Sequence, residues 1–288
     1  MINNLASLEE AQKKFANFLK NKGRAQATIL AYRKDIQQLV DFFKSKEITQ
    51  ADSVRSEDIE EFKKDLLEKK YTAKSVSRKL NAIKTFFRFL EEEKIIIKNP
   101  STSVSHPKYE IKTPRIFSQT EYRAIRDAAR QDTRVSTIIE LLLQTGMRIG
   151  ELARLEITSI SDDHLEIKEY ESHKARRVPL NKAAKKALNE YLAVRPKVRN
   201  KSLFITKSGR PFLIRNIRGA IERYFRLAGI ENAKVNDLRH TFIAHQLAAG
   251  NSVVLIQKLV GHKRLSTTEK YLEFIKGKSQ EEIKIKEL

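Results

Sequence analysis

Four short segments in the second half of this 288-residue sequence contain side chains suited to phosphoryl chemistry. Their sequences are TGMRIGEL (145–152), NDLRH (236–240), LVGH (259–262) and TTEKY (267–271). Each segment by itself has an ordinary structural explanation, because an arginine can form an ion pair, a histidine can occupy a turn and a tyrosine can pack in a core. Together they supply the groups that phosphodiester cleavage requires.

Cleavage of a phosphodiester without a metal requires a nucleophile, cations that stabilise the phosphoryl oxygens and an acid for the leaving oxygen. Arg148 and Arg239 suit the second task, because a guanidinium binds two phosphate oxygens and keeps its charge. Tyr271 can attack phosphorus and conserve the bond as a phosphotyrosine, so that rejoining needs no ATP. His262 lies nine residues before Tyr271, a spacing that lets one loop deliver both.

In this order and spacing, the four segments resemble those of the tyrosine recombinases of the Xer and phage-integrase type. That pattern is an Arg in a TG-x-R-x-x-E-L box, then His-x-x-Arg, then Leu-Gly-His, then a Tyr nine residues later. The resemblance implies that Arg148 and Arg239 bind the non-bridging oxygens of the scissile phosphate and that His262 hydrogen-bonds to it. It implies that Tyr271 forms a 3′-phosphotyrosyl link and frees a 5′-hydroxyl. Glu151 would support Arg148, with packing as its alternative role.

The sequence departs from the family pattern at two positions. Asn236 stands where the family usually has a His, and asparagine donates hydrogen bonds but takes up no proton. The family's catalytic Lys lies in a β-hairpin before a V-P-L strand, and ungapped counting from the VPL at 178–180 places Glu171 at that position. We therefore expect Lys174, in the predicted turn, to protonate the leaving oxygen. Lys168 is the alternative acid, and a simple contact with backbone phosphate is the alternative role for Lys174.

The formal net charge of +21 and the pI near 10.0 indicate a polyanionic partner. Residues 1–110 contain 22 Lys and Arg against 16 Asp and Glu, and residues 111–288 contain 35 against 20, so both parts are basic. A solvated, Lys-rich surface is the alternative explanation. No run of about 18 apolar residues and no signal peptide is evident, which favours DNA over a membrane. We therefore expect a cytoplasmic, nucleoid-associated protein.

Metal and cofactor sites are not expected. The sequence has no cysteine, and its closest histidine pair, His240 and His245, is five residues apart, so the two do not share a helical face.

The first part of the chain shows only helical periodicity. Four amphipathic helices are expected within about 100 residues, and they would form a small bundle with its own core. Asn99-Pro100-Ser101 ends this pattern, and the polar stretch that follows contains Pro107 and Pro114. We predict a helical core-binding domain at 1–105, a linker at 106–115 and a catalytic domain with a C-terminal tail at 116–288.

The second part mixes helices with three short strand-like pieces, at residues 156–160, 165–170 and 177–180. Helices are predicted through residues 138–146 and 148–155, and at about 182–195, 214–228, 237–249, 252–260 and 266–275. The expected fold class is mainly α with a small β-sheet: a SAM-like helical bundle followed by an α+β catalytic domain. In such recombinases the tail often packs into a neighbouring protomer, and fraying is the alternative for residues 277–288.

The favoured hypothesis is a site-specific recombinase for integration, excision or resolution of DNA. Its two domains would close around duplex DNA at a recombination site, and a homotetramer would exchange strands through a Holliday junction without metal or nucleotide. A type IB topoisomerase, which also forms a 3′-phosphotyrosine, is one alternative. A DNA-binding relative without catalysis is the other, and Asn236 together with the displaced lysine argues for it.

Overall fold

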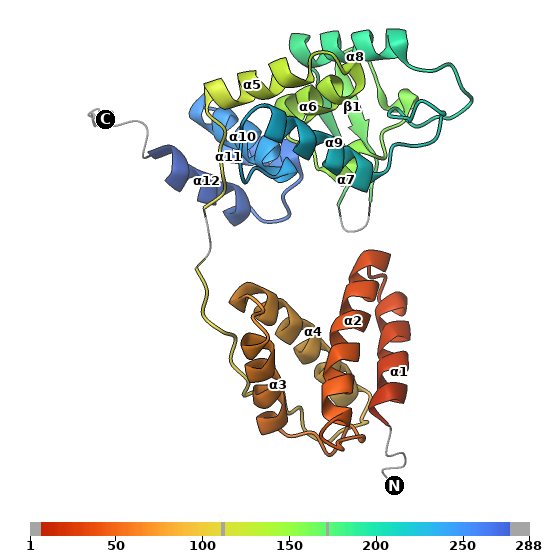
Figure 1. The fold of residues 1–288 in the computed structure, drawn as a ribbon, viewed down its shortest axis with the longest axis vertical. Helices are drawn as coiled ribbons and strands as arrows, with labels where there is room; N and C mark the ends of the chain where they lie inside the picture. The colour runs from red at the N-terminus through yellow and green to blue at the C-terminus, as the bar shows by residue number, and fades with distance from the viewer. Residues whose placement is uncertain (1–6, 111–112, 171–172, 277–288) are drawn as a thin grey trace, which may run out of the picture. The chain divides into compact units, whose positions relative to one another are not determined.

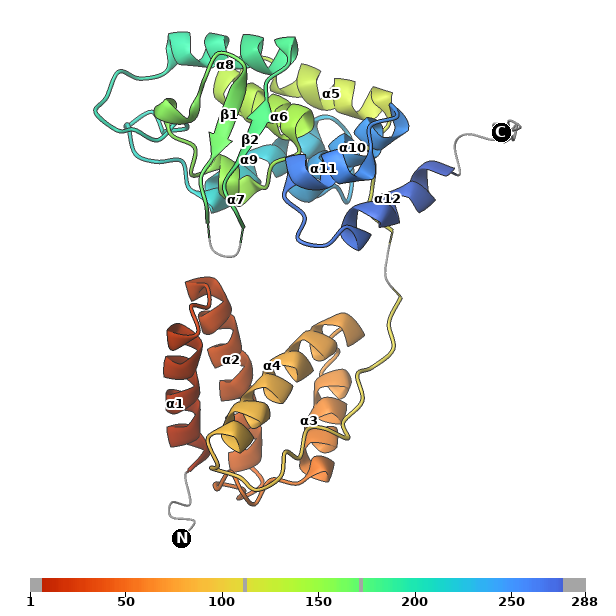
Figure 2. The same cartoon turned by 180° about the vertical axis from the view of Figure 1, so that it is seen from behind.

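The computed structural model describes residues 7–110, 113–170 and 173–276, and the chain divides into two compact units, Met1–Ile111 and Lys112–Leu288 (Figures 1 and 2). The described residues form twelve α-helices, one 3-10 helix and one two-stranded sheet. This confirms the predicted fold class, mainly α with a small sheet. Glu171 and the tail at 277–288 lie outside the described residues, so the expectations for them stay predictions.

The N-terminal unit is a bundle of four helices with a phenylalanine-rich core. The helices are α1 (Leu8–Asn21), α2 (Gln26–Lys44), α3 (Ser56–Glu68) and α4 (Ala73–Glu92). Helix α4 packs against the other three, and its Phe86 meets Phe15 of α1 edge-on with 5.3 Å between ring centroids. Buried Asp35 of α2 accepts hydrogen bonds from Arg78 and Lys79 of α4, so one carboxylate joins the two helices.

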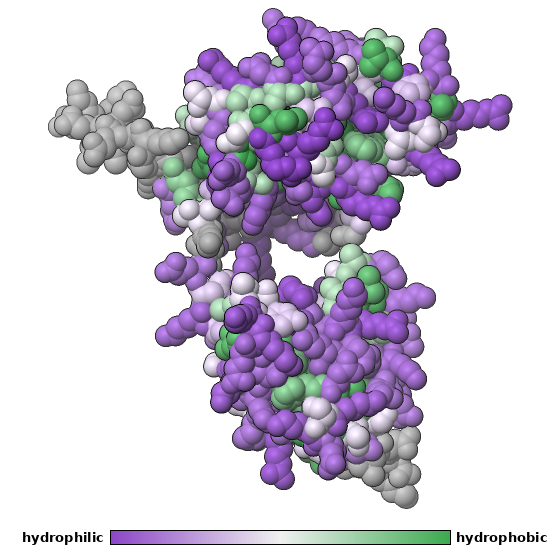
Figure 3. Space-filling view, in the orientation of Figure 1, coloured by the Kyte–Doolittle hydropathy of each residue, from purple (hydrophilic) through white to green (hydrophobic). Residues whose placement is uncertain are grey.

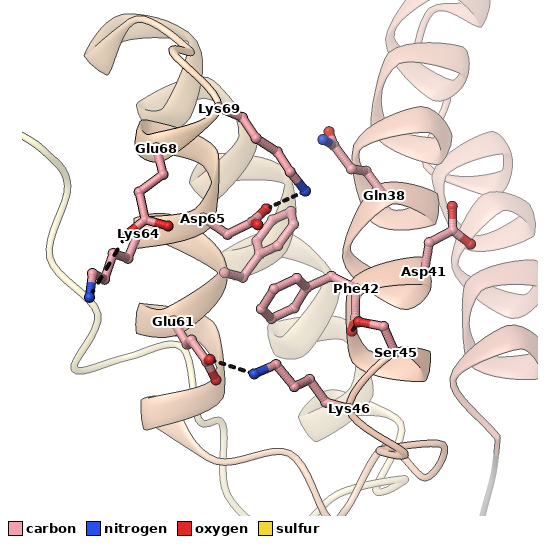
Figure 4. A pocket seen from close by; sticks show the side chains of 11 residues that line it. Gln38, Asp41, Phe42, Ser45, Lys46, Glu61, Lys64, Asp65, Glu68 and Lys69 are labelled. Carbon is pink, nitrogen blue, oxygen red and sulfur yellow. Dashed lines mark hydrogen bonds and ion pairs between the residues drawn. The ribbon is translucent and has the colours of Figure 1, made fainter.

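A polar groove lies between α2 and α3 (Figure 4). Lys46 pairs with Glu61 at 2.6 Å across it, and Lys69 pairs with Asp65 at 2.9 Å along its wall. The rings of Phe42 and Phe62 lie 5.2 Å apart between these pairs. The charges of the groove thus largely neutralise one another, and we assign it a structural role.

The C-terminal unit is built around α6, against which α5, α8, α9 and α10 pack. The first elements of the unit are α5 (Gln119–Ala129), α6 (Thr133–Thr145) and α7 (Ile149–Leu152). The later ones are β1 (His164–Ile167), β2 (Arg176–Pro179), α8 (Lys182–Val194), α9 (Ile214–Leu227), α10 (Val235–Ala248), α11 (Val253–Val260) and α12 (Ser266–Lys276). Strands β1 and β2 pair antiparallel, with Leu165 opposite Val178, and both of these side chains enter the core.

Two of the predicted elements differ from the structure. The predicted strand at 156–160 is wrong: Ile157–Ser159 is a 3-10 helix, and its neighbours form only isolated bridges. The physical reason is local, because the Ser159 hydroxyl accepts a hydrogen bond from the Glu156 N–H at 3.2 Å and closes a turn. The predicted helix at 148–155 is confined to the four residues of α7.

Helices α10, α11 and α12 form a second apolar cluster beside the main core of this unit. It includes Phe242, Ile256, Val260 and Tyr271. Because α10 also packs on α6, residues near position 240 lie close to the end of α6 and to the end of α11. This packing brings segments that are far apart in the sequence to one place.

Hydrophilic side chains cover most of the surface that faces the viewer in Figure 3, on both units. Among the described helices, none combines the length and the apolar character needed to cross a bilayer.

Candidate active site

The TGMRIGEL segment forms the turn from α6 to α7 and fixes the backbone of Arg148. Gly146 ends α6 with φ of 60°, and a Cβ there would overlap the ring of Phe242 from α10. Arg148 then precedes α7, and its backbone N–H donates to Glu151 Oε2 at 2.8 Å. The positive φ of Gly146 and the nearby ring of Phe242 mean that only glycine fits at position 146, both for the turn and for the close approach of α10.

Glu151 is a buried carboxylate held by two arginines. Arg176 of β2 donates from Nη1 and Nη2 to its two oxygens at 2.9 and 2.8 Å, and Arg148 donates from Nη1 at 3.1 Å. Burial by itself would raise the pKa of Glu151, but the hydrogen bonds and charges of Arg176 and then Arg148 outweigh it and lower the pKa to about 2. Glu151 is thus ionised at neutral pH and forms ion pairs with both arginines.

Three arginines converge on the C-terminal end of α11. Arg176 Nε donates to the Leu259 carbonyl at 2.7 Å, and Arg239 Nη2 donates to the Val260 carbonyl at 2.7 Å. Arg148 donates to the carbonyls of Val260 and Gly261 at 3.3 and 3.0 Å. The free carbonyls and the negative end of the helix dipole favour these cations.

Arg239 is the most buried of the three. Its Nη1 also donates to the Gly146 carbonyl at 2.6 Å, which ties α10 to the turn after α6. Burial, followed by the charge of Arg148, lowers the pKa of Arg239 to about 9, so the guanidinium is still protonated at neutral pH. Arg148 and Arg239 both donate to the Val260 carbonyl, so the two cations are close and repel each other. An anion bound between them would relieve that repulsion.

The glycine of LVGH makes this convergence possible. Gly261 follows α11 with φ of 67°, and a Cβ at this position would lie 3.0 Å from Nη1 of Arg176. The next backbone N–H, that of His262, donates to the Gln257 carbonyl at 3.0 Å. Helix α11 therefore ends with its carbonyls on the arginines and its following residue turned toward the same site.

His262 is neutral and has one ring nitrogen already engaged. Burial, followed by the charges of Arg239 and Arg148, lowers its pKa to about 3. Its Nδ1 lies 2.8 Å from the hydroxyl of the fully buried Thr268. When that hydroxyl donates to Nδ1, the ring carries its proton on Nε2 and can donate it to an oxygen.

Tyr271 lies between two histidines. The centroid of its ring is 6.4 Å from that of His262, with the planes at 24°, and its hydroxyl lies 2.5 Å from Nδ1 of His240. Burial raises the pKa of Tyr271, and Arg239 offsets only part of this increase. The phenol is therefore protonated at neutral pH. Asn236 is exposed one turn earlier on α10, and its Nδ2 lies 2.7 Å from Nε2 of His240.

The structure does not bring either candidate lysine into contact with these groups. Lys168 donates to Glu156 at 2.7 Å. Lys174 is exposed, and its amine forms no hydrogen bond or ion pair with any residue that the structure describes. For its neighbour His173, burial and then the charge of Arg148 lower the pKa. His173 is thus within reach of the electrostatic effect of Arg148.

Six of the predicted site residues come together here: Arg148, Glu151, Asn236, Arg239, His262 and Tyr271. Three further residues at the site were not expected from the sequence, namely Arg176, His240 and Thr268. Arg176 is the third residue of the basic KARR run before VPL, His240 directly follows the second arginine and Thr268 lies three residues before Tyr271. These sequence positions alone did not identify the three as site residues, because none of them implies a long-range contact.

Comparison with known proteins identifies the family of the chain. A model of the phage integrase family matches residues 115–276, and one of the phage integrase N-terminal SAM-like domain matches residues 13–94. The chain is 31% identical over 277 residues to the tyrosine recombinase XerC of Thermodesulfovibrio yellowstonii, with 89% of each chain covered.

Two solved structures of lambda integrase have the same fold at 18% sequence identity. One is a dimer bound to a COC' core site, with a TM-score of 0.79 over 98% of this chain and 81% of that chain. The other is a tetramer bound to a Holliday junction, with a TM-score of 0.75 over 90% of this chain and 78% of that one.

Proposed function

The chain belongs to the phage integrase family and is a site-specific tyrosine recombinase, and we propose that Tyr271 is its nucleophile. The observation that supports this role most is the cluster itself: a buried tyrosine whose pKa is influenced by the charge of Arg239, which in turn is repelled by Arg148. A scissile phosphate would supply the missing negative charge. The side chain of Arg148 is 27% exposed to solvent, so it would contact one non-bridging oxygen of the phosphate directly. Arg239 would stabilise the other non-bridging oxygen.

The remaining groups take roles that follow from their protonation. Neutral His262 donates its Nε2 proton to the phosphate, and ionised Glu151 holds Arg148 in place through the bonds described above. Lys174 protonates the leaving 5′-oxygen, and Lys168 is the alternative acid. The bond energy is conserved in a 3′-phosphotyrosyl link, so rejoining needs neither ATP nor a metal.

The partner in this proposal is a double-stranded recombination site. The net charge of +21 supports DNA as the ligand of both units, and the lambda integrase tetramer on a Holliday junction suggests a homotetramer here. Such a protein would act at the nucleoid in the cytoplasm. The two matched family models favour a recombinase over a type IB topoisomerase.

A covalent trap tests the nucleophile. The full chain is incubated with fragmented genomic DNA of its source, denatured with SDS, and the protein-linked DNA is recovered and sequenced to identify the site. We expect an SDS-resistant adduct whose peptide contains Tyr271. Tyr271→Phe should abolish it, whereas Tyr224→Phe, a buried tyrosine of α9 with its hydroxyl 3.5 Å from Asp132, should not.

Absence of any adduct from the wild-type chain would support the non-catalytic alternative. Relaxation of supercoiled plasmid that lacks the recovered site would support the topoisomerase alternative. An adduct that survives Tyr271→Phe would show that another residue attacks.

A further inference from the structure

Three side chains from two helices form a continuous polar chain at the nucleophile. Asn236 and His240 are one turn apart on α10, and Tyr271 is on α12. The imidazole contacts the Asn236 carboxamide through Nε2 at 2.7 Å and the Tyr271 hydroxyl through Nδ1 at 2.5 Å. Spacing of four residues places Asn236 and His240 on the same helical face, so this geometry is built into α10.

The proposed reaction leaves one proton without an acceptor. Burial raises the pKa of Tyr271, so its hydroxyl must lose a proton as it attacks. Asn236 takes up no proton, although it occupies the position where a histidine is usual in the family pattern. His262 is unsuitable, because its Nδ1 is engaged by Thr268 and its basicity is low. His240 is the basic group in contact with the phenol oxygen.

We propose that His240 accepts the proton of Tyr271 and that Asn236 orients its ring, an inference that rests on the function proposed above. As the Tyr271 Oη–P bond forms and the P–O5′ bond breaks, the phenolic proton moves to Nδ1 of His240. The leaving 5′-oxygen takes its proton from the separate acid. In rejoining, the 5′-hydroxyl returns its proton to that acid, attacks phosphorus and expels Tyr271, which recovers its proton from His240.

The carboxamide of Asn236 suits the orienting role. Its nitrogen Nδ2 lies 2.7 Å from Nε2 of His240. A 180° turn of the carboxamide about its Cβ–Cγ bond exchanges nitrogen and oxygen, and the oxygen then accepts the Nε2 proton, which leaves the Nδ1 lone pair directed at the phenol. Once Nδ1 is protonated, the same Nε2–H to oxygen bond persists, so no rearrangement is required. Cysteine proteases use an asparagine in the corresponding way toward their catalytic histidine. The departure at Asn236 is thus accompanied by a histidine one turn along the helix.

Burial, more than the surrounding charges, keeps His240 neutral at pH 7. Burial lowers its pKa below the usual 6.5, Asp237 on the same helix partly opposes this, and Arg239 reinforces it. From the other elements, neutral His262 and protonated Tyr271 face it. His240 is therefore able to accept a proton at neutral pH and loses that capacity only as acid protonates it.

The first test is single-turnover cleavage of a synthetic duplex that carries the recovered site. His240→Gln keeps a hydrogen-bonding amide but cannot take up a proton, so we expect cleavage to fall by roughly 10²-fold or more, within the usual range for a general base. DNA binding and the melting temperature should not change. His245→Gln, the same substitution at an exposed position of α10, should cleave at the wild-type rate.

A substrate with sulfur at the bridging 5′ position separates the two proton transfers. A thiol has a pKa of about 8.5, so the thiolate is a good leaving group and does not need an acid to protonate it. This substrate should restore cleavage by Lys174→Ala but not by His240→Gln. Restoration of His240→Gln would overturn the proposal, as would a rate within about threefold of wild type on the oxygen substrate.

A second variant keeps the proposal testable if His240→Gln is unstable. Asn236→Asp changes an exposed residue and adds a negative charge beside Nε2 of His240. That charge raises the pKa of His240, so the acid limb of the pH–rate profile should move to higher pH. An acid limb that does not move would refute the proposal.

The outcomes also separate this inference from the proposed function. Loss of the adduct in Tyr271→Phe with full activity in His240→Gln would reject this inference alone, whereas an adduct in Tyr271→Phe would reject the proposed nucleophile itself.

Discussion

Replacing Glu151 with glutamine should destabilise the C-terminal unit strongly while leaving its shape almost unchanged. The substitution keeps the size of the side chain but removes the charge that faces Arg176 and Arg148. The native environment lowers the pKa of Glu151 from 4.5 to about 2. At about 1.4 kcal/mol per pKa unit, this corresponds to roughly 3 kcal/mol, similar to the cost of breaking other buried ion pairs.

The pH dependence of this loss has a defined sign. Because the folded pKa lies below the unfolded value, the stabilisation from Glu151 is fully present above pH 4.5 and is lost as the pH falls toward 2. The wild-type chain should therefore be more stable than Glu151→Gln by about 3 kcal/mol at pH 7, and the difference should shrink below pH 4.5.

Urea denaturation followed by circular dichroism measures the difference in the full chain. Hydrogen exchange of α6 and α10, detected by mass spectrometry, assigns the transition to the C-terminal unit. Glu156→Gln is the matched control, since Glu156 also bonds a cation at 2.7 Å but at the surface, and its midpoint should not move. A loss at pH 7 below about 1 kcal/mol, or one that persists unchanged at pH 3, would refute the reasoning.

Three further substitutions have defined outcomes. Gly261→Ala should destabilise the chain by more than about 1 kcal/mol, because a Cβ is strained at φ of 67° and crowds Arg176; a melting temperature equal to wild type would contradict this. Lys174→Ala should slow cleavage of the oxygen substrate by at least about tenfold and Lys168→Ala should not, and the opposite result would identify Lys168 as the acid. Asp35→Ala should cost the N-terminal unit about 3 kcal/mol in urea denaturation, because it leaves buried Lys79 without its carboxylate; a change within error would show that Lys79 finds another partner.

Periodicity and end signals were sufficient to predict most elements. Ser118 and Glu121 start α5 with reciprocal hydrogen bonds, and Gly146 and Gly261 end α6 and α11. These signals act over three or four residues, so they can be recognised without the fold. The strand predicted at Glu156–Ile160 is wrong because the prediction used only the alternation of apolar residues. That alternation does not show that the Ser159 hydroxyl closes a local turn.

The motifs also supplied the residue types of the site, and their order was enough to nominate Arg148, Arg239, His262 and Tyr271. The contacts that surround them could not be predicted in the same way. Arg176 is 25 residues from Glu151 and His240 is 31 residues from Tyr271. Each pair meets only because β2 lies beside α7 and α10 packs against α12.

The sequence by itself determined that this chain is basic and mostly helical and that it contains the groups for phosphodiester cleavage. Only the tertiary structure decided how those groups are charged and paired. A pKa depends on burial and on charges from every nearby segment, so the ionised Glu151, the neutral His262 and the protonated Tyr271 are properties of the packed unit. The contact between His240 and Tyr271 also depends on the tertiary structure, because these residues meet only when α10 packs against α12.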